Sequence, residues 1–375
     1  MILTQCAACA APLPRLAKQC SRCKTRYCSA ACQKKHWEEG GHDTLCKKIK
    51  KAGGAEQYHA NKKYGEAVVV AAEACAEDTK GQTCYICMEA VHRRTKEGLV
   101  RRCAYHTTEG FAHVSCLAEQ TKILVVEAVE NRLDWEALNA RWQRWNACGL
   151  CEQEYHGFVK HALGWACWKT YVGLPESDLC HGAAMAQLGN GLYSVSQHED
   201  ALSVKTAELS LERRLGAPEL TILSIQANLA SSYEAVGRTD EGLCLRRDVY
   251  SKTVRLVGEE SSETLLAAMN YAMSLRDLQH YGEARSLMRK EIPVAQRVLG
   301  ENHDLTLRMR RVHAVALYKD TGATLDDLRD AVKTLNETER TARRVLGGSH
   351  PDVVDIVHSL RDARAKLAAR ESGGA

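Results

Sequence analysis

The sequence predicts a mainly α-helical protein, with small cysteine-rich fingers at the N-terminus followed by an α-solenoid of helical hairpins. Ala, Leu, Glu and Arg are abundant, whereas only two Phe and six Pro occur in 375 residues, and this balance favours helix over sheet. Seven of the 17 cysteines lie within the first 46 residues. The second half of the chain repeats a pattern every 42 residues, and such a period indicates stacked helical units.

The composition also limits where the protein is expected to work. Apolar residues make up 45% and charged residues 26%, which is ordinary for a soluble globular protein. The first residues lack the basic segment of a signal peptide, and the longest apolar run, AVVVAA at 67–72, is too short to cross a bilayer. We therefore expect an intracellular protein, cytoplasmic or nuclear, without membrane contact. In a reducing compartment its cysteines are expected to bind metal rather than to form disulfides.

The first cysteine cluster has the spacing of metal ligands. The ligands come in four pairs, each separated by two or three residues: Cys6 and Cys9, Cys20 and Cys23, Cys28 and Cys32, His42 and Cys46. Zinc takes four nitrogen or sulfur ligands in a tetrahedron, so these eight ligands make two sites. About 50 residues with so little apolar content need a zinc staple in order to fold.

This stretch resembles the MYND zinc finger over residues 6–46, at all eight ligand positions and at Gln33 and Trp37. The resemblance implies an interleaved pairing: one zinc on Cys6, Cys9, Cys28 and Cys32, and another on Cys20, Cys23, His42 and Cys46. It also implies a protein partner, because MYND fingers bind proteins, often through short proline-containing segments. We expect Trp37 to lie in the small core of the finger rather than to contact a peptide.

A second group of ligand residues has the order of another zinc finger. It comprises Cys84, Cys87, Cys103, His113, Cys116, Cys148 and Cys151. This order resembles the RING-CH (RINGv) finger. The resemblance implies a third zinc on Cys84, Cys87, His113 and Cys116, and a fourth on Cys103, a residue at 105, Cys148 and Cys151.

The fourth zinc site departs from the RING-CH pattern, because Tyr105 stands where the family has Cys. A tyrosine phenol, with a pKa near 10, is a poor zinc ligand. His106 lies one residue out of register and is the first substitute. Two further interpretations stay open: a three-ligand site completed by water or by a more distant group such as His156, and loss of this zinc.

The same resemblance raises the question of enzymatic activity. RING-CH fingers belong to ubiquitin ligases and bind a ubiquitin-conjugating enzyme through an apolar residue inside the first Cys pair, matched here by Ile86. The last pair, CGLC at 148–151, lacks the Pro often found there, and no Trp follows Cys116. The surface for the conjugating enzyme is therefore incomplete.

The C-terminal half contains copies of one pattern. Gly216, Gly258 and Gly300 are 42 residues apart, as are Asn228 and Asn270. Each copy predicts two amphipathic helices, a short turn and a glycine exit. The pattern resembles tetratricopeptide repeats (TPR) of the kinesin-light-chain kind over residues 180–370. The resemblance implies stacked hairpins whose first helices line a concave groove for peptides.

By repeat position, six residues are candidates for lining that groove. They are Glu234, Arg276, Asp277, Arg311, Tyr318 and Lys319. For each of them a solvated helix face is the plainer interpretation.

We expect five segments along the chain. They are a MYND-type finger at 1–50, a helical linker at 51–80, a RING-CH-like finger with an inserted helix at 81–175, TPR-like repeats at 176–370 and a disordered tail at 371–375. The leading hypothesis is a zinc-binding adaptor whose MYND finger and TPR groove recognise peptide segments of partner proteins. The alternative is a ubiquitin ligase whose second finger recruits a conjugating enzyme and whose repeats select substrate.

The remaining classes of function are less favoured. Residues 1–51 hold eleven Lys or Arg and three acidic residues, but a solvated small domain explains this charge more simply than a nucleic-acid partner. The sequence contains no phosphate loop, nucleophile elbow or catalytic zinc motif. An enzyme is therefore not the leading interpretation.

Overall fold

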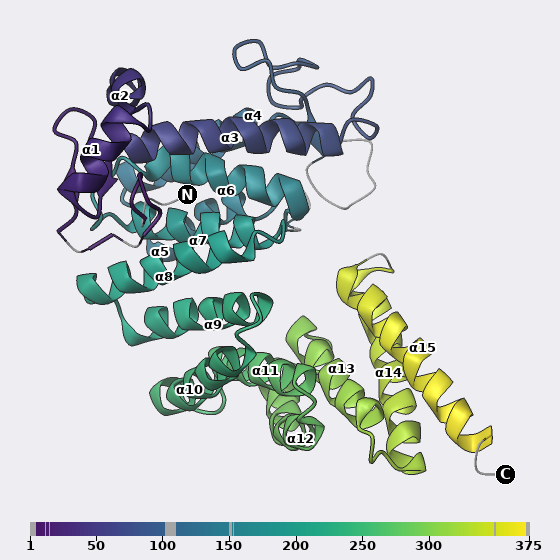
Figure 1. The fold of residues 1–375 in the computed structure, drawn as a ribbon. Helices are drawn as coiled ribbons and strands as arrows, with labels where there is room; N and C mark the ends of the chain where they lie inside the picture. Colours follow the sequence, from purple (N-terminus) through teal and green to yellow (C-terminus); the bar gives the residue numbers. More distant parts are fainter. Residues whose placement is uncertain are drawn as a thin grey trace. The chain divides into compact units, whose positions relative to one another are not determined.

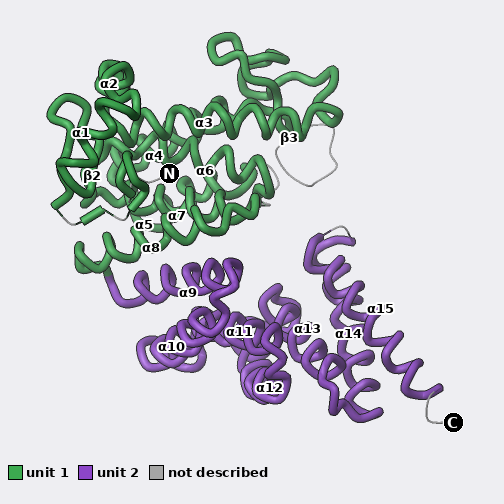
Figure 2. The backbone as a smooth tube through the Cα atoms, in the orientation of Figure 1, with its two compact units in different colours: residues 1–217 green, residues 218–375 purple. Residues whose placement is uncertain are grey.

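A computed structural model shows the chain as two compact units, residues 1–217 and residues 218–375 (Figures 1 and 2). It describes residues 5–11, 13–14, 16–101, 110–149, 152, 154–348 and 350–372. Helices dominate these residues and the strands form two short antiparallel pairs, so the prediction of a mainly helical fold is confirmed. No helix in these residues is long and apolar enough to span a membrane.

The first finger combines a short hairpin with two short helices. Its elements are β1 (Lys18–Gln19), β2 (Arg26–Tyr27), α1 (Ala30–Glu38) and α2 (His42–Lys51). Ser29 caps α1, because its hydroxyl accepts the backbone N–H of Cys32 at 3.1 Å. Gly41, in the left-handed region at φ 69°, precedes α2. His42 and Cys46 consequently lie one turn apart on the same face of α2.

The rest of the first unit packs helices around the second finger. The elements are α3 (Ala55–Ala74), β3 (Val100–Arg101), β4 (Phe111–Ala112), α4 (Val114–Glu130), α5 (Trp135–Trp142), the short 3-10 helix η1 (Gln143–Trp145), α6 (Gly157–Tyr171), α7 (Leu179–Tyr193) and α8 (His198–Leu215). Figure 1 shows α3 running alongside α6. One core joins these elements, and Trp145, Trp165 and Trp168 are all buried in it.

Two glycines let α6 and α7 approach closely. A Cβ atom added at Gly164 would lie 3.0 Å from the carbonyl oxygen of Gln187, and one added at Gly191 would lie 3.0 Å from that of Lys160. Both contacts are with backbone of the opposite helix, which cannot move as a side chain can. The pair therefore sets the distance between α6 and α7.

The second unit consists of consecutive helical hairpins. Its helices are α9 (Glu219–Ala235), α10 (Thr239–Val257), α11 (Ser262–Asp277), α12 (Tyr281–Val298), α13 (Asp304–Lys319), α14 (Leu325–Leu346) and α15 (Pro351–Ser372). Each helix packs against the next one in sequence (Figure 2). Gly216, Gly258 and Gly300 all end a hairpin at positive φ, which explains their regular spacing. The hairpin of α7 and α8 lies in the first unit, so the division at 217 falls inside the predicted repeat region.

Candidate metal centres and the adjoining surfaces

The first finger brings its predicted ligands together in two groups. In each group the ligand atoms lie within 4.8 Å of one another: Cys6, Cys9, Cys28 and Cys32 in one, and Cys20, Cys23, His42 and Cys46 in the other. The Sγ atoms of Cys28 and Cys32 are 3.5 Å apart, and those of Cys20 and Cys46 are 3.8 Å apart. Zn–S bonds of about 2.3 Å give tetrahedral edges of about 3.8 Å, whereas a disulfide needs about 2.05 Å. The spacing therefore fits a metal ion.

The second finger forms a third group with the same dimensions. It consists of Cys84, Cys87, His113 and Cys116. The Nδ1 atom of His113 lies 3.4 Å from the Sγ of Cys87 and 3.6 Å from that of Cys116. A tetrahedron with Zn–N of about 2.0 Å and Zn–S of about 2.3 Å has mixed edges of about 3.5 Å. This group thus has the donors and the size that zinc requires.

The two histidines present different ring nitrogens to their groups. His42 turns Nε2 toward Cys23, at 3.4 Å, whereas His113 turns Nδ1 inward. The opposite nitrogens, Nδ1 of His42 and Nε2 of His113, are buried without a hydrogen-bond partner among the described residues. Both imidazoles are held by packing, for example by the ring of Trp37 at 5.7 Å from that of His42.

Backbone N–H groups lower the pKa of some of the ligand thiols. Burial raises the pKa of Cys6, but the N–H groups of Cys28 and Ala8 outweigh this effect and bring the pKa to about 6. The pKa of Cys84 is also lowered. Burial raises this pKa, but hydrogen bonds from backbone N–H groups have the larger, opposite effect. Because thiolates rather than thiols bind metal, the N–H groups favour metal binding at these two cysteines.

One backbone turn recurs at the three pairs of cysteine ligands that are separated by two residues in the described metal groups. In the turns beginning at Cys6, Cys20 and Cys84, the fifth residue has φ between 58° and 61°, and its N–H donates to the carbonyl of the cysteine at 2.7–2.9 Å. The turn directs the two cysteine side chains toward one point. Its conformation is the local reason why two cysteines separated by two residues can face one metal ion. His113 and Cys116 have the same spacing but lie at the start of α4 instead.

The predicted fourth site lies largely outside the described residues, since Cys103, His106 and Cys151 are not among them. Cys148 is described and buried, and Glu152 completes the same turn, with φ 58° and an N–H that donates to Cys148 at 2.9 Å. The turn also occurs at His92, however, where the hydroxyl of Thr95 contacts the Nδ1 atom of His92 at 2.7 Å. The turn is therefore compatible with a metal but does not require one.

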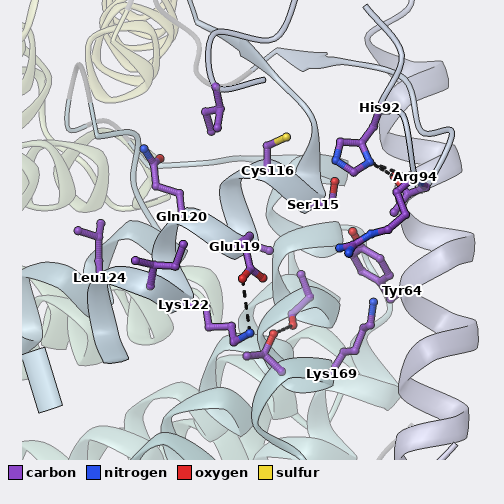
Figure 3. A pocket seen from close by; sticks show the side chains of 16 residues that line it. Tyr64, His92, Arg94, Ser115, Cys116, Glu119, Gln120, Lys122, Leu124 and Lys169 are labelled. Carbon is purple, nitrogen blue, oxygen red and sulfur yellow. Dashed lines mark hydrogen bonds and ion pairs between the residues drawn. The ribbon is translucent and has the colours of Figure 1, made fainter. Parts of the chain in front are cut away.

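A pocket of about 620 Å³ adjoins the third group (Figure 3). Its walls come from α3, the loop after Cys84, the first half of α4, and α6. Ile86, the residue predicted to contact a conjugating enzyme, lies in this wall and is half-buried. The sequence did not predict this pocket, because its residues come from four separate segments and share no spacing.

The six candidate groove residues have different surroundings. Asp277 and Lys319 are exposed, Arg276 is half-buried, and Arg311 lies 3.5 Å from Asp355. The carboxylate of Glu234 pairs with Arg246 at 3.1 Å. It also accepts a hydrogen bond from Ser274, so it joins three helices of its own unit.

The positions of Tyr318 and Trp37 differ from those that the sequence predicts. Tyr318 is only 4% exposed and belongs to the core formed by α13, α14 and α15, so it is not offered to a partner. Trp37 is 42% exposed, although the sequence places it in the core of the finger. The reason is that α1 buries no residue fully, because the cysteines and Tyr27 already fill the small core.

Comparison with known proteins assigns two modules. Residues 6–46 match the family model of the MYND finger, and residues 264–304 match a tetratricopeptide repeat model. The fold and the metal centres thus define a zinc-finger protein with helical repeats. More particularly, this chain carries a MYND finger and a tetratricopeptide repeat, and α11 and α12 form the matched hairpin.

Solved structures that resemble the chain share little sequence with it. BtubC (BKLC) from P. vanneervenii has 14% identity over 69% of this chain and 85% of that one, with a TM-score of 0.43. The nearly identical TPR-like repeats of a putative kinesin light chain from Podosopora anserina have 16% identity over 62% and 98% of the two chains, with a TM-score of 0.39. The search of curated proteins gives no match.

Proposed function

We propose that this protein is an intracellular adaptor that holds segments of partner proteins on its MYND finger and in its TPR groove, with zinc as a structural element. The three closed four-ligand groups support this proposal most directly. A catalytic zinc keeps a position open for water or substrate, whereas four protein ligands complete a structural site. Free thiols that must stay reduced to bind zinc agree with a reducing compartment.

Zinc is the proposed metal for all three groups, and Cys103, His106, Cys148 and Cys151 are proposed to hold a fourth ion. The turn at Cys148 supports this fourth site, since among the described residues three of the four other turns of that form carry cysteine ligands. Native mass spectrometry of the intact chain measures the number of zinc ions bound per chain. Four zinc ions falling to three in Cys103→Ser support the fourth site, and three ions in both proteins refute it.

Trp37 is the proposed partner contact on the MYND finger. Its indole is exposed next to His42, at the surface of the second metal group. An exposed aromatic side chain on a rigid support is typical of interaction hot spots. The support here is α1, which Cys32 attaches to the first metal group, together with the ring of His42 in the second group.

In the TPR groove, the proposed contacts are Arg276, Asp277, Arg311 and Lys319, which lie on the first helices of their hairpins. Glu234 is proposed to act mainly through its bond to Arg246, and Tyr318 is left out because it is buried. Charged side chains along such a surface set specificity for a complementary segment more than they set affinity.

Peptide selection on the zinc-loaded full-length chain tests the proposal. Random 12-residue peptides are displayed and selected with the wild type and with Trp37→Ala, Arg276→Gln and, as a control on a second helix, Arg297→Gln. We expect two families of peptides, one lost in Trp37→Ala and the other in Arg276→Gln, and both kept in Arg297→Gln. Enrichment that none of these substitutions changes would overturn the proposal.

The ubiquitin-ligase alternative gains no support from the comparisons or from the described residues. Ile86 is half-buried in a pocket wall rather than presented on an open surface. Autoubiquitination assays with a panel of conjugating enzymes remain its direct test.

A further inference from the structure

The pocket beside the third metal group has two chemically different ends (Figure 3). Arg94, Lys169 and Ser115 gather at one end, around the ring of Tyr64. Ile86, Ile123 and Leu124 supply apolar surface elsewhere in the lining. At about 620 Å³, the pocket is large enough for two or three side chains of a peptide.

Two of the positive charges at the polar end are not neutralised within the pocket lining. Lys122 pairs with Glu119 at 3.5 Å, as the dashed line in Figure 3 shows. Arg94 and Lys169, by contrast, have no ion-pair partner anywhere in the part of the chain that the structure describes. The ammonium group of Lys169 lies 4.1 Å from the centre of the Tyr64 ring, which holds it in place.

A buried carboxylate limits the excess charge to about one unit. Glu97 is 8% exposed, and its charge acts on both Lys169 and Tyr64. Burial lowers the pKa of Lys169, and neighbouring Arg94 lowers it further, whereas Glu97 opposes this effect. Two cations beside one buried anion suit a ligand with a single negative charge. A phosphate carries nearly two negative charges, and the second would face Glu97 and Glu119.

Ser115 adds an unused hydrogen-bonding group to the same end. Its Oγ atom is buried and has no hydrogen-bond partner among the described residues. An unmade hydrogen bond of a buried hydroxyl costs free energy that a ligand oxygen can recover. Figure 3 shows this oxygen pointing toward the space beneath His92.

We propose that this pocket binds a peptide segment of a partner protein, with one carboxylate at the Arg94–Lys169 end and an apolar side chain against Ile86, Ile123 and Leu124. The pocket is a third binding site, separate from the MYND surface and the TPR groove. Its wall depends on the third metal group, because Ile86 lies between Cys84 and Cys87 and Ser115 precedes Cys116. The finger would thus serve as one wall of a peptide site.

Three matched pools of immobilised nine-residue peptides test this site. Each pool carries randomised apolar positions and differs only at the central residue, which is Asp or Glu, Asn or Gln, or phosphoserine. The zinc-loaded full-length chain is compared with Arg94→Gln and Lys169→Gln. Arg93→Gln is the matched control, since Arg93 is adjacent in sequence, is paired with Glu89 and does not line the pocket.

We expect the wild type to retain the acidic pool about tenfold better than the amide pool, because bonds to a charged group are the strong ones. Arg94→Gln and Lys169→Gln should each abolish most of this preference, while Arg93→Gln should keep it. Arg94 is exposed on a loop, so its substitution leaves folding intact even if Lys169→Gln does not. Unchanged zinc content checks that each variant is folded.

Three results would overturn the inference. The first is equal retention of the acidic and amide pools by the wild type, and the second is an acidic preference that survives both substitutions. The third is stronger retention of the phosphoserine pool, which would refute the assignment to a carboxylate. Peptides selected by the TPR groove depend on Arg276 instead, so failure here leaves the adaptor proposal intact.

Discussion

The first finger and the helical repeats reach a folded state by different means. In the finger, four of the seven buried apolar residues that form its core are cysteines of the metal groups: Cys6, Cys20, Cys23 and Cys46. The core around α11, α12 and α13 instead consists of aliphatic side chains such as Leu265, Met288 and Met309. Metal binding thus replaces a hydrophobic core in one region, whereas stacking of hairpins supplies it in the other.

The second finger is intermediate between these two cases. Cys84 and Cys116 belong both to the third metal group and to the large core that contains Trp145 and Trp168. Its fold therefore rests on metal and on packing together. Loss of metal should disturb it less than it disturbs the first finger.

Of the changes predicted here, removal of zinc should produce the largest difference in stability between the first finger and the repeats. A chelator should unfold residues 5–52, because a structural zinc contributes about 10–16 kcal/mol of apparent folding free energy. Helices α9 to α15 should be unaffected, since no described residue of theirs lies in a metal group. Hydrogen exchange followed by mass spectrometry, with and without chelator, measures both regions in one sample. Equal loss of protection in the finger and in the repeats would contradict the distinction.

The second prediction tests the packed core of the repeats. Leu265→Ala should cost about 2–5 kcal/mol of unfolding free energy, because Leu265 is fully buried and the substitution leaves a cavity. Leu266→Ala is a matched control, since the neighbouring Leu266 is 43% exposed and should change stability by less than about 0.5 kcal/mol. Urea unfolding followed by hydrogen exchange of α11 and α12 gives both values. A chelator should not alter either result, and similar losses in the two variants would disprove the assigned burial.

The third prediction concerns the polar network between the repeats. Arg246 is 7% exposed and donates to Glu234, to Ser231 and to the carbonyl of Ala227. Arg246→Ala should cost about 3 kcal/mol, at the lower end for a broken buried pair, because Glu234 keeps some contact with water. Arg247→Ala, at the exposed neighbouring position, should be nearly neutral. Equal losses of unfolding free energy in Arg246→Ala and Arg247→Ala would mean that the network does not stabilise the unit.

The sequence was sufficient for features that depend on local spacing. Cys6 and Cys9, or Cys84 and Cys87, lie within one turn of backbone, so their spacing predicts their geometry. Gly216, Gly258 and Gly300 likewise mark helix ends by their own conformation. These features need no knowledge of the rest of the fold.

Features that depend on packing between distant segments were not predicted. Repeat position alone could not reveal that Tyr318 lies under α15, and the composition of the finger did not reveal that Trp37 is exposed. The pocket was not predicted for the same reason. Arg94 and Lys169 line one pocket only because the second finger packs on α6.

The smallest expected effect is a loss of stability of the first unit in acid. Burial lowers the pKa of His161 on α6 to about 4, and its Nε2 atom accepts a hydrogen bond from the indole N–H of Trp165 at 3.0 Å. The unfolded chain has a histidine pKa of about 6.5, so between these values the unfolded state binds more protons. Stability from this group is therefore complete above pH 6.5 and is lost as the pH falls toward 4.

His161→Gln isolates this contribution, because both proteins lose zinc equally at a given pH. The difference in unfolding free energy between wild type and variant should shrink by about 1 kcal/mol from pH 7 to pH 5, which allows for solvent screening. A difference that does not vary with pH would mean that protonation of His161 does not destabilise the first unit.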